Sequence, residues 1–188
     1  MRSKLIPTIP GQPRSKENLS AGETAGLPLP ADAGEDKRMT SATVHASAVL
    51  VGARAALIRG PSGAGKSRLA LDLIQAARTG ALPFARLVAD DRVYLEAAGG
   101  RLLARPAEPL AGLLEVRGGG LLRLAHEPCA VVGLVVDLAA ADAERLPQAE
   151  SRETEIAGIK LPRLAVASDA VALPLVLALI TSSRANWI

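Results

Sequence analysis

The chain has 188 residues, of which 49% are hydrophobic, enough for one domain with a sizeable core. Its 22 basic and 19 acidic residues leave a formal net charge of +3, and only three residues are aromatic. Base-stacking aromatics and a basic stripe are both missing, which argues against nucleic acid as the main partner. The single cysteine, Cys129, excludes an internal disulfide and a multi-cysteine metal site.

Residues 1–40 differ in composition from the rest of the chain. Five of the 13 prolines lie there, and apolar residues are sparse and follow no period. We expect a disordered leader, because such a segment cannot bury enough apolar surface to offset its ordering entropy. No signal peptide is visible, and the longest apolar run, residues 170–180, is too short to span a bilayer. The sequence therefore predicts a cytoplasmic protein without a membrane partner, folded over residues 41–188.

Two short apolar segments open this domain. Residues 47–51 and 55–59 flank Gly52-Ala53-Arg54 and predict a β-hairpin. The second strand leads into an eight-residue motif that fits G-x-x-x-x-G-K-[ST]. That motif consists of Gly60, Pro61, Ser62, Gly63, Ala64, Gly65, Lys66 and Ser67. Apolar residues then recur at helical spacing as far as Thr79-Gly80, which predicts a helix directly after the motif.

A strand, a glycine turn and a helix start are the parts of a phosphate-binding loop. The glycines let the backbone approach a polyphosphate, and the N–H groups of the first helical turn point at it. Lys66 can reach the β- and γ-phosphates of a nucleotide, and the Ser67 hydroxyl can bind Mg²⁺. The alternative is a glycine-rich turn that carries a lysine by chance, but the flanking strand and helix favour nucleotide binding.

An apolar strand that ends in carboxylates is the second requirement of a nucleotide–Mg²⁺ site. Residues 84–89 form such a segment, and Asp90 and Asp91 follow it directly. One carboxylate can hold the metal, directly or through water, and the other can take a proton from an attacking hydroxyl. The alternative is a polar strand end capped by acids. The phosphate loop upstream favours the functional interpretation.

A second hairpin is predicted over residues 93–105, around Gly99-Gly100. In the strand that follows, Glu115 and Arg117 share a face because side chains alternate. Next to three glycines, this pair could hold Mg²⁺ and a phosphate, or be a surface ion pair before a loop. Residues 131–138 are a nearly continuous Val/Leu run, which is typical of a central strand buried on both faces.

The remaining chain predicts a loop with a helical turn over residues 139–157 and a last strand over 159–166, broken by Pro162. A C-terminal helix follows from about residue 168, with Ser168 or Asp169 as N-cap and Pro174 bending it or delaying its start. The fold class is therefore α/β: a mixed sheet with hairpins, a helix after the phosphate loop and a C-terminal helix.

Taken in chain order, these pieces resemble a known family. The set is His45, the phosphate loop, LVADDRV at 87–93, LLEVRGGG at 113–120, and Arg145-Leu146. It resembles the catalytic domain of HPr kinase/phosphorylase, a bacterial enzyme that acts on a serine of the phosphocarrier protein HPr. Many ATPases share the loop, whereas the two later motifs are far more specific in this order. The resemblance covers residues 43–166, implies a P-loop kinase domain, and is to the truncated form without the N-terminal domain.

The resemblance implies a Mg²⁺- and ATP-dependent serine kinase. Lys66 and Ser67 would bind the phosphates and Mg²⁺, and Glu115 would be a further Mg²⁺ ligand. One of Asp90 and Asp91, by preference Asp91, would accept the seryl proton.

Two further residues match catalytic positions of the family, His45 and Arg145. Without the resemblance, His45 would be taken as structural or exposed, and Arg145 has no distinguishing context. The resemblance also implies HPr as protein substrate, a role in regulating the phosphotransferase system and carbon metabolism, and a homo-oligomer, hexameric in the family.

The sequence departs from the family at three places. Arg68 follows the loop serine where the family has an acid, and the segment after LLEVRG lacks the family's aspartate. Residues 161–164 stand in for a longer segment that the family ties to dephosphorylation and substrate contact. The resemblance therefore implies kinase activity more directly than phosphorolysis.

Two other functions compete with this one. A small-molecule kinase or another P-loop ATPase often carries an arginine-rich lid or an LSGGQ signature; neither is visible, and LLEVRG would go unexplained. The loss of the acidic residues would favour a third function, a non-catalytic nucleotide sensor that signals through the leader. Here Asp90, Asp91 and Glu115 are all present.

Overall fold

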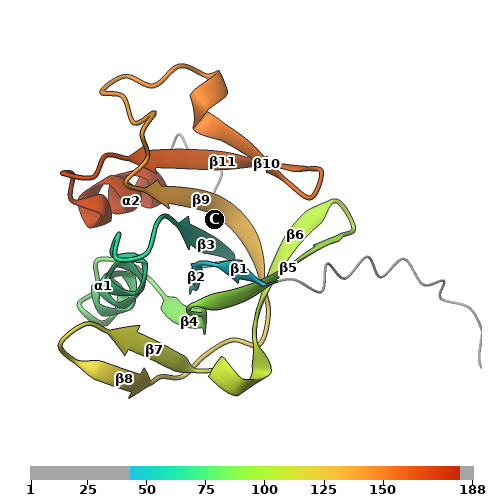
Figure 1. The fold of residues 1–188 in the computed structure, drawn as a ribbon, viewed down its shortest axis with the longest axis vertical. Helices are drawn as coiled ribbons and strands as arrows, with labels where there is room; N and C mark the ends of the chain where they lie inside the picture. Colours follow the sequence, from blue (N-terminus) through green and yellow to red (C-terminus); the bar gives the residue numbers. More distant parts are fainter. Residues whose placement is uncertain (1–42, 183–188) are drawn as a thin grey trace, which may run out of the picture. The chain divides into compact units, whose positions relative to one another are not determined.

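A computed structural model describes residues 43–182 of the chain (Figure 1). The leader predicted over residues 1–40 lies outside this range, and the predicted domain limits of 41 and 188 stay predictions. None of the helices within the described range is long and apolar enough to cross a membrane. The elements in chain order are β1 (Val44–His45), β2 (Ser47–Val51), β3 (Arg54–Arg59), α1 (Lys66–Arg78), β4 (Ala85–Ala89), β5 (Arg92–Ala98), β6 (Arg101–Pro106), β7 (Leu113–Val116), β8 (Gly120–Arg123), β9 (Ala130–Leu138), β10 (Glu153–Ile156), β11 (Ile159–Val166) and α2 (Ala172–Thr181).

The main sheet is mixed, as the sequence predicts. Its order is β1-β5-β6-β9-β3-β2-β4, with β11 beside β9 and β10 beside β11. Strand β9 runs parallel to β3 and β11 and antiparallel to β6. Both predicted hairpins, β2–β3 and β5–β6, are present. Strands β7 and β8 pair only with each other, and in Figure 1 α1 lies between this small sheet and α2.

Strand β9 is buried on both faces, which confirms the interpretation of its Val/Leu run. Val135 packs in one apolar cluster with Leu57 of β3, and Val136 packs in the other with Ile58. Neighbouring residues of a strand point to opposite faces, so the two clusters cover the two sides of the sheet. The cluster around Val136 also contains the buried face of α1, including Leu73, and fixes that helix against the sheet.

The loop with a helical turn predicted over residues 139–157 is partly confirmed, since a 3-10 turn spans Glu150–Arg152, and partly wrong, because the segment also contains β10, which pairs antiparallel with β11. The break predicted at Pro162 is also wrong, since β11 runs through it. Pro162 is the last residue of β11 that pairs with β10, and Arg163 is the first that pairs with β9. A proline lacks the N–H of a strand ladder, and it is tolerated here where the pairing passes from one neighbour to the other.

Helix α2 begins at Ala172, later than the cap prediction places it. Its N-cap is Val171, which makes no side-chain capping bond, so neither Ser168 nor Asp169 caps this helix. Pro174 lies in the first turn, where a missing N–H breaks no intrahelical bond. The alternative in which Pro174 delays the helix start agrees with this geometry.

Ion pairs join the carboxyl ends of β3 and β9 to the middle of β11. Asp137 of β9 accepts hydrogen bonds from Arg59 Nε at 2.7 Å and from Arg163 Nε at 2.6 Å. Arg163 also donates to Asp142 at 2.6 and 2.9 Å. Burial disfavours the charged form of Asp137, but the bonds from Arg59 and Arg163 outweigh it, and the pKa of Asp137 lies below its ordinary value. The network holds these three strands together beside the phosphate loop.

Replacing Asp137 with asparagine should lower the free energy of unfolding by about 3 kcal/mol at pH 7, because two arginines lose their charged partner. A carboxyl whose pKa is lowered by folding stabilises the protein above its unfolded pKa, and this stabilisation is lost as the pH falls through the folded pKa. The difference between the two proteins should therefore shrink below about pH 4. Urea unfolding followed by circular dichroism over pH 3–7 measures it.

Asp142→Asn is the matched control, because Asp142 bonds the same arginine from an exposed position. We expect little change in its unfolding free energy. A deficit of Asp137→Asn that stays constant with pH would show that ionisation of Asp137 does not stabilise the fold.

Candidate active site

The phosphate loop connects β3 to α1. Its first glycine has no room for a side chain, since a Cβ on Gly60 would lie 2.7 Å from the carbonyl oxygen of Leu138. Gly65 has φ 94° and is the N-cap of α1, which has no side-chain cap and no acid in its first turn. The partial positive charge of the helix N-terminus is therefore not neutralised by its own sequence, as anion binding requires.

Lys66 lies at the mouth of this loop. The residue is 7% exposed, and its Nζ donates to the carbonyl oxygens of Gly60 at 2.9 Å and Pro61 at 3.0 Å. Burial lowers the pKa of Lys66, and the charges of Asp90 and Asp91 oppose this shift. The Nζ of Lys66 is thus held over the loop, next to two carboxylates that favour its charged form.

The two adjacent aspartates have different surroundings. Asp90 is 4% exposed, and its Oδ1 accepts hydrogen bonds from Ser47 Oγ at 2.5 Å and Ser67 Oγ at 3.0 Å. Its Oδ2 accepts from the backbone N–H of Glu115 at 3.2 Å. Asp90 therefore joins β2, α1 and β7 at one point, and fixes the Ser67 hydroxyl beside the loop.

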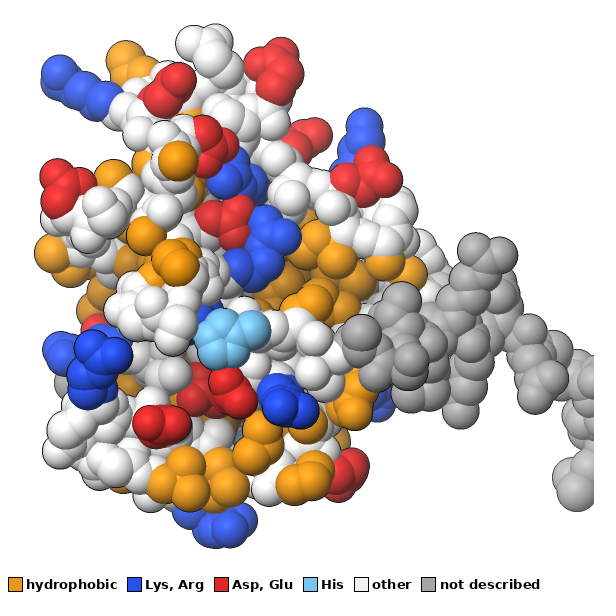
Figure 2. Space-filling view, in the orientation of Figure 1, with side chains coloured by type: hydrophobic (Ala, Val, Ile, Leu, Met, Phe, Trp, Pro, Cys, Tyr) orange, Lys and Arg blue, Asp and Glu red, His pale blue; other side chains and the backbone are white. Residues whose placement is uncertain are grey.

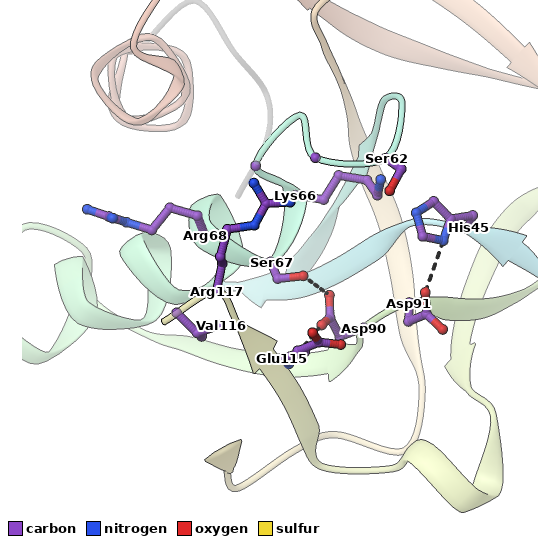
Figure 3. A pocket seen from close by; sticks show the side chains of 12 residues that line it. His45, Ser62, Lys66, Ser67, Arg68, Asp90, Asp91, Glu115, Val116 and Arg117 are labelled. Atoms are coloured by element: carbon purple, nitrogen blue, oxygen red, sulfur yellow. Dashed lines mark hydrogen bonds and ion pairs between the residues drawn. The ribbon is translucent and has the colours of Figure 1, made fainter. Parts of the chain in front are cut away.

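Asp91 points into the open part of the site. Its side chain is 56% exposed and forms an ion pair with His45, whose Nδ1 lies 3.0 Å from Oδ1. Its backbone has φ 65°, a conformation that aspartate adopts more readily than most residues. In Figure 3 the His45–Asp91 pair lies apart from Ser67, Asp90 and Glu115, which gather beneath the loop. The turn after β4 thus separates two consecutive carboxylates.

A cavity of about 510 Å³ collects these groups. Figure 2 shows acidic side chains at the surface next to a histidine in the middle of one face, with basic side chains on both sides. The cavity is lined by His45, Ser62, Gly63, Gly65, Lys66, Ser67, Arg68, Asp90, Asp91, Glu115, Val116 and Arg117.

The oxygen donors at this cavity fit Mg²⁺. Within residues 43–182 no three His, Cys, Asp or Glu side chains form a metal site by themselves. Mg²⁺ binds through one or two carboxylates together with substrate phosphates and water. Ser67, Asp90 and Glu115 offer hydroxyl and carboxylate oxygens next to a loop built for phosphate.

Most of the residues predicted for the site line this cavity, and Gly60, Pro61 and Ala64 belong to the phosphate loop beside it. Arg145 lies exposed in the loop after β9 and is not among the cavity-lining residues, so its catalytic role stays a prediction. The sequence interpretation missed Ser47, whose hydroxyl anchors Asp90, because a serine in an apolar strand carries no signal of its distant partner. It noted Arg68 only as a departure from the family, yet Arg68 lines the cavity.

Comparisons with known proteins point to one family. Residues 37–172 match the family model described as HPr Serine kinase C-terminal domain. The HPr kinase/phosphorylases of Streptococcus sanguinis and Streptococcus gordonii are 32% and 35% identical over 143 and 144 residues, 70% of this chain and 44% of each relative. The chain thus spans less than half the length of these relatives.

The fold agrees as well. The solved structure of the HPr(Ser) kinase/phosphatase from Coxiella burnetii superposes with a TM-score of 0.61 at 24% identity. The match covers 76% of this chain and 95% of the Coxiella burnetii chain, which supports the P-loop kinase fold. With the family model matched over most of its length, this chain belongs to the HPr serine kinase C-terminal domain family.

Proposed function

We propose that this protein is an ATP- and Mg²⁺-dependent serine kinase whose substrate is the phosphocarrier protein HPr. The observation that carries the proposal is the separation of the two consecutive carboxylates. Asp90 is buried and bonded to Ser67, whereas Asp91 is exposed and bonded to His45. Within one cavity, one acid can therefore bind the metal while the other accepts the proton of an incoming hydroxyl.

The phosphate side of the site holds and neutralises the triphosphate. The loop N–H groups and Lys66 bind the β- and γ-phosphates. Ser67, Asp90 and Glu115 would hold Mg²⁺, which supplies positive charge to the transferring phosphoryl group. The hydrogen bond from Ser67 to Asp90 fixes the hydroxyl in place before the nucleotide binds.

Proton transfer takes place at Asp91, next to His45. The serine oxygen of HPr attacks the γ-phosphorus, the bond to the bridging oxygen of ADP breaks, and the seryl proton passes to Asp91. His45 orients the Asp91 carboxylate through its Nδ1 contact of 3.0 Å. With its side chain 56% exposed, Asp91 can be reached by a residue on another protein.

The proposal covers kinase action within bacterial phosphotransferase regulation, in the cytoplasm where HPr acts. Residues 41–188 form its catalytic domain. Assembly into a homo-oligomer and a role for Arg145 are parts of the same proposal that rest on the family resemblance alone.

Transfer from γ-labelled ATP is the direct test. The purified protein is incubated with Mg²⁺ and either HPr or a panel of nucleosides and small metabolites. We expect label on HPr and none on the panel. Label on a small molecule with HPr unlabelled would make the protein a small-molecule kinase instead.

Replacing Glu115 with glutamine should raise the Mg²⁺ concentration needed for half-maximal activity by about tenfold, because a neutral amide is a weaker ligand than a carboxylate. The fold should be unaffected, since Asp90 is bonded by the backbone N–H of Glu115 and not by its side chain. Titrating the rate with Mg²⁺ at saturating ATP measures the effect. An unchanged Mg²⁺ requirement would remove Glu115 from the metal site.

A further inference from the structure

Two strand pairs bring Ser47 directly opposite Asp90. Strand β2 pairs antiparallel with β4 and matches Ala48 with Ala89, the residue before Asp90. Strand β1 pairs antiparallel with β5 in the same register. One step on from the matched alanines, this shared register places Ser47 across from Asp90. Opposite residues of an antiparallel pair have side chains within reach of each other, and the Ser47 hydroxyl bonds the Asp90 carboxylate.

The same register places Ala46 opposite Asp91. Ala46 is fully buried and carries no polar side-chain atom, so its side chain cannot bond Asp91. In Figure 3 the Asp91 carboxylate is turned toward His45 instead. A serine thus faces the first aspartate and an alanine faces the second, and only the first aspartate is held inside the fold.

We propose that Ser47 is a positioning residue for phosphoryl transfer, which holds Asp90 in the orientation that lets Ser67 bind Mg²⁺. The inference rests on the proposed function, in which Asp90 and Ser67 both hold the metal. Ser47 is 0% exposed and is not among the residues that line the cavity, so it contacts neither the nucleotide nor the acceptor. Its effect on the reaction passes through Asp90.

A single oxygen of Asp90 accepts hydrogen bonds from both serines. Its Oδ1 lies 2.5 Å from Ser47 Oγ and 3.0 Å from Ser67 Oγ. A carboxylate can only accept and each hydroxyl has one proton, so both serines donate to this oxygen. The lone pairs of Ser67 Oγ are then directed away from Asp90, and Ser67 lines the cavity in which a cation would be bound.

Loss of the Ser47 hydroxyl would leave Asp90 short of one partner. Asp90 is 4% exposed, and its other hydrogen bonds come from Ser67 and from the backbone N–H of Glu115. A buried acceptor without its donor is costly, so we expect the carboxylate to rotate toward another donor. This rotation would also turn the Ser67 hydroxyl, and the oxygens that hold the metal would no longer be in place.

The test measures ATP affinity by calorimetric titration, once with excess Mg²⁺ and once with EDTA. Ser47→Ala should weaken the binding of ATP with Mg²⁺ by about tenfold or more, as is typical when a group that orients a metal ligand is removed. Its affinity for ATP in EDTA should stay within about twofold of the wild type, because the loop and Lys66 bind the phosphates without Ser47. Ser47→Thr keeps the hydroxyl and should restore most of the Mg²⁺ effect. Ser47→Cys, with a similar size and a weaker donor, replaces the alanine variant should that one fold poorly.

Val49→Ala is the matched control for a loss of stability. Val49 lies two residues further along β2, is fully buried and has no polar side-chain atom. Its truncation leaves a cavity and should lower the unfolding temperature. The effect of Mg²⁺ on its ATP affinity should nevertheless be that of the wild type. A purely structural role of Ser47 would give this same pattern for Ser47→Ala.

Three results would overturn the inference while the proposed function stands. They are a Ser47→Ala protein with the wild-type Mg²⁺ effect, one whose ATP affinity falls equally with Mg²⁺ and with EDTA, and a folded Ser47→Thr protein that behaves like Ser47→Ala. A wild-type protein whose ATP affinity does not respond to Mg²⁺ would instead contradict the metal site of the proposed function, and the inference with it.

Discussion

The Asp91→Asn variant should lose about 10³-fold in kcat for phosphoryl transfer to HPr, while its affinity for ATP changes by less than about twofold. Asparagine keeps the shape of the side chain but cannot accept the seryl proton. Asp91 has no bond to the loop or to Ser67, and its contact within the site is with His45 at 3.0 Å. The loss should therefore fall on the chemical step. Single-turnover transfer and a separate ATP titration measure the two quantities.

Asp90→Asn is the informative comparison, because it makes the same chemical change, from carboxylate to amide, at the neighbouring residue. Asp90 bonds Ser47, Ser67 and the Glu115 backbone. Its replacement should weaken Mg²⁺-dependent nucleotide binding and lower the unfolding temperature, neither of which is expected for Asp91→Asn. If Asp91→Asn keeps a rate near wild type, the assignment of Asp91 as proton acceptor fails.

The second large effect is expected for Lys66→Met, which should lower kcat/KM for ATP by about 10³-fold or more. Methionine preserves the buried aliphatic stem but removes the only side-chain cation that the sequence motif directs at the phosphates. The unfolding temperature should change little, because the Nζ contacts are to two loop carbonyls and not to the core. Lys160→Met, on the exposed face of β11, is a control that should behave as the wild type.

Steady-state kinetics with HPr and thermal unfolding of both lysine variants decide the matter. A Lys66→Met protein that transfers phosphate at the wild-type rate would contradict the phosphate-contact role. A protein that has lost its fold would show that the loop carbonyls need the ammonium for stability, and the kinetic loss would then have a different cause.

The elements of the fold that depend on local pattern could be predicted from the sequence. The two hairpins, α1 and the buried strand β9 follow from turn glycines, helical periodicity and a continuous apolar run. Strand β10 was not predicted, although Thr154 and Ile156 alternate with two glutamates, because a four-residue segment is too short to indicate a strand until it pairs with β11. Tertiary pairing also carries β11 through Pro162, against its local preference.

Most members of the candidate site could be predicted from the sequence, but Ser47 was missed, Arg145 does not line the cavity, and the different surroundings of the two aspartates could not be foreseen. Asp90 and Asp91 are the same residue type in consecutive positions, so the sequence cannot assign them different roles. The difference arises from the positive φ of Asp91 and from Ser47, which lies 43 residues before Asp90 in the chain. Such long-range contacts exist only in the folded protein.

Mass spectrometry of HPr tests the central claim most directly. HPr is incubated with the full chain, ATP and Mg²⁺, digested and sequenced, with Lys66→Met and Asp91→Asn in parallel. The account predicts one phosphoryl group on one serine of HPr with the wild-type protein, and at most a trace with either variant. Unmodified HPr after incubation with a wild-type protein that still consumes ATP would contradict it.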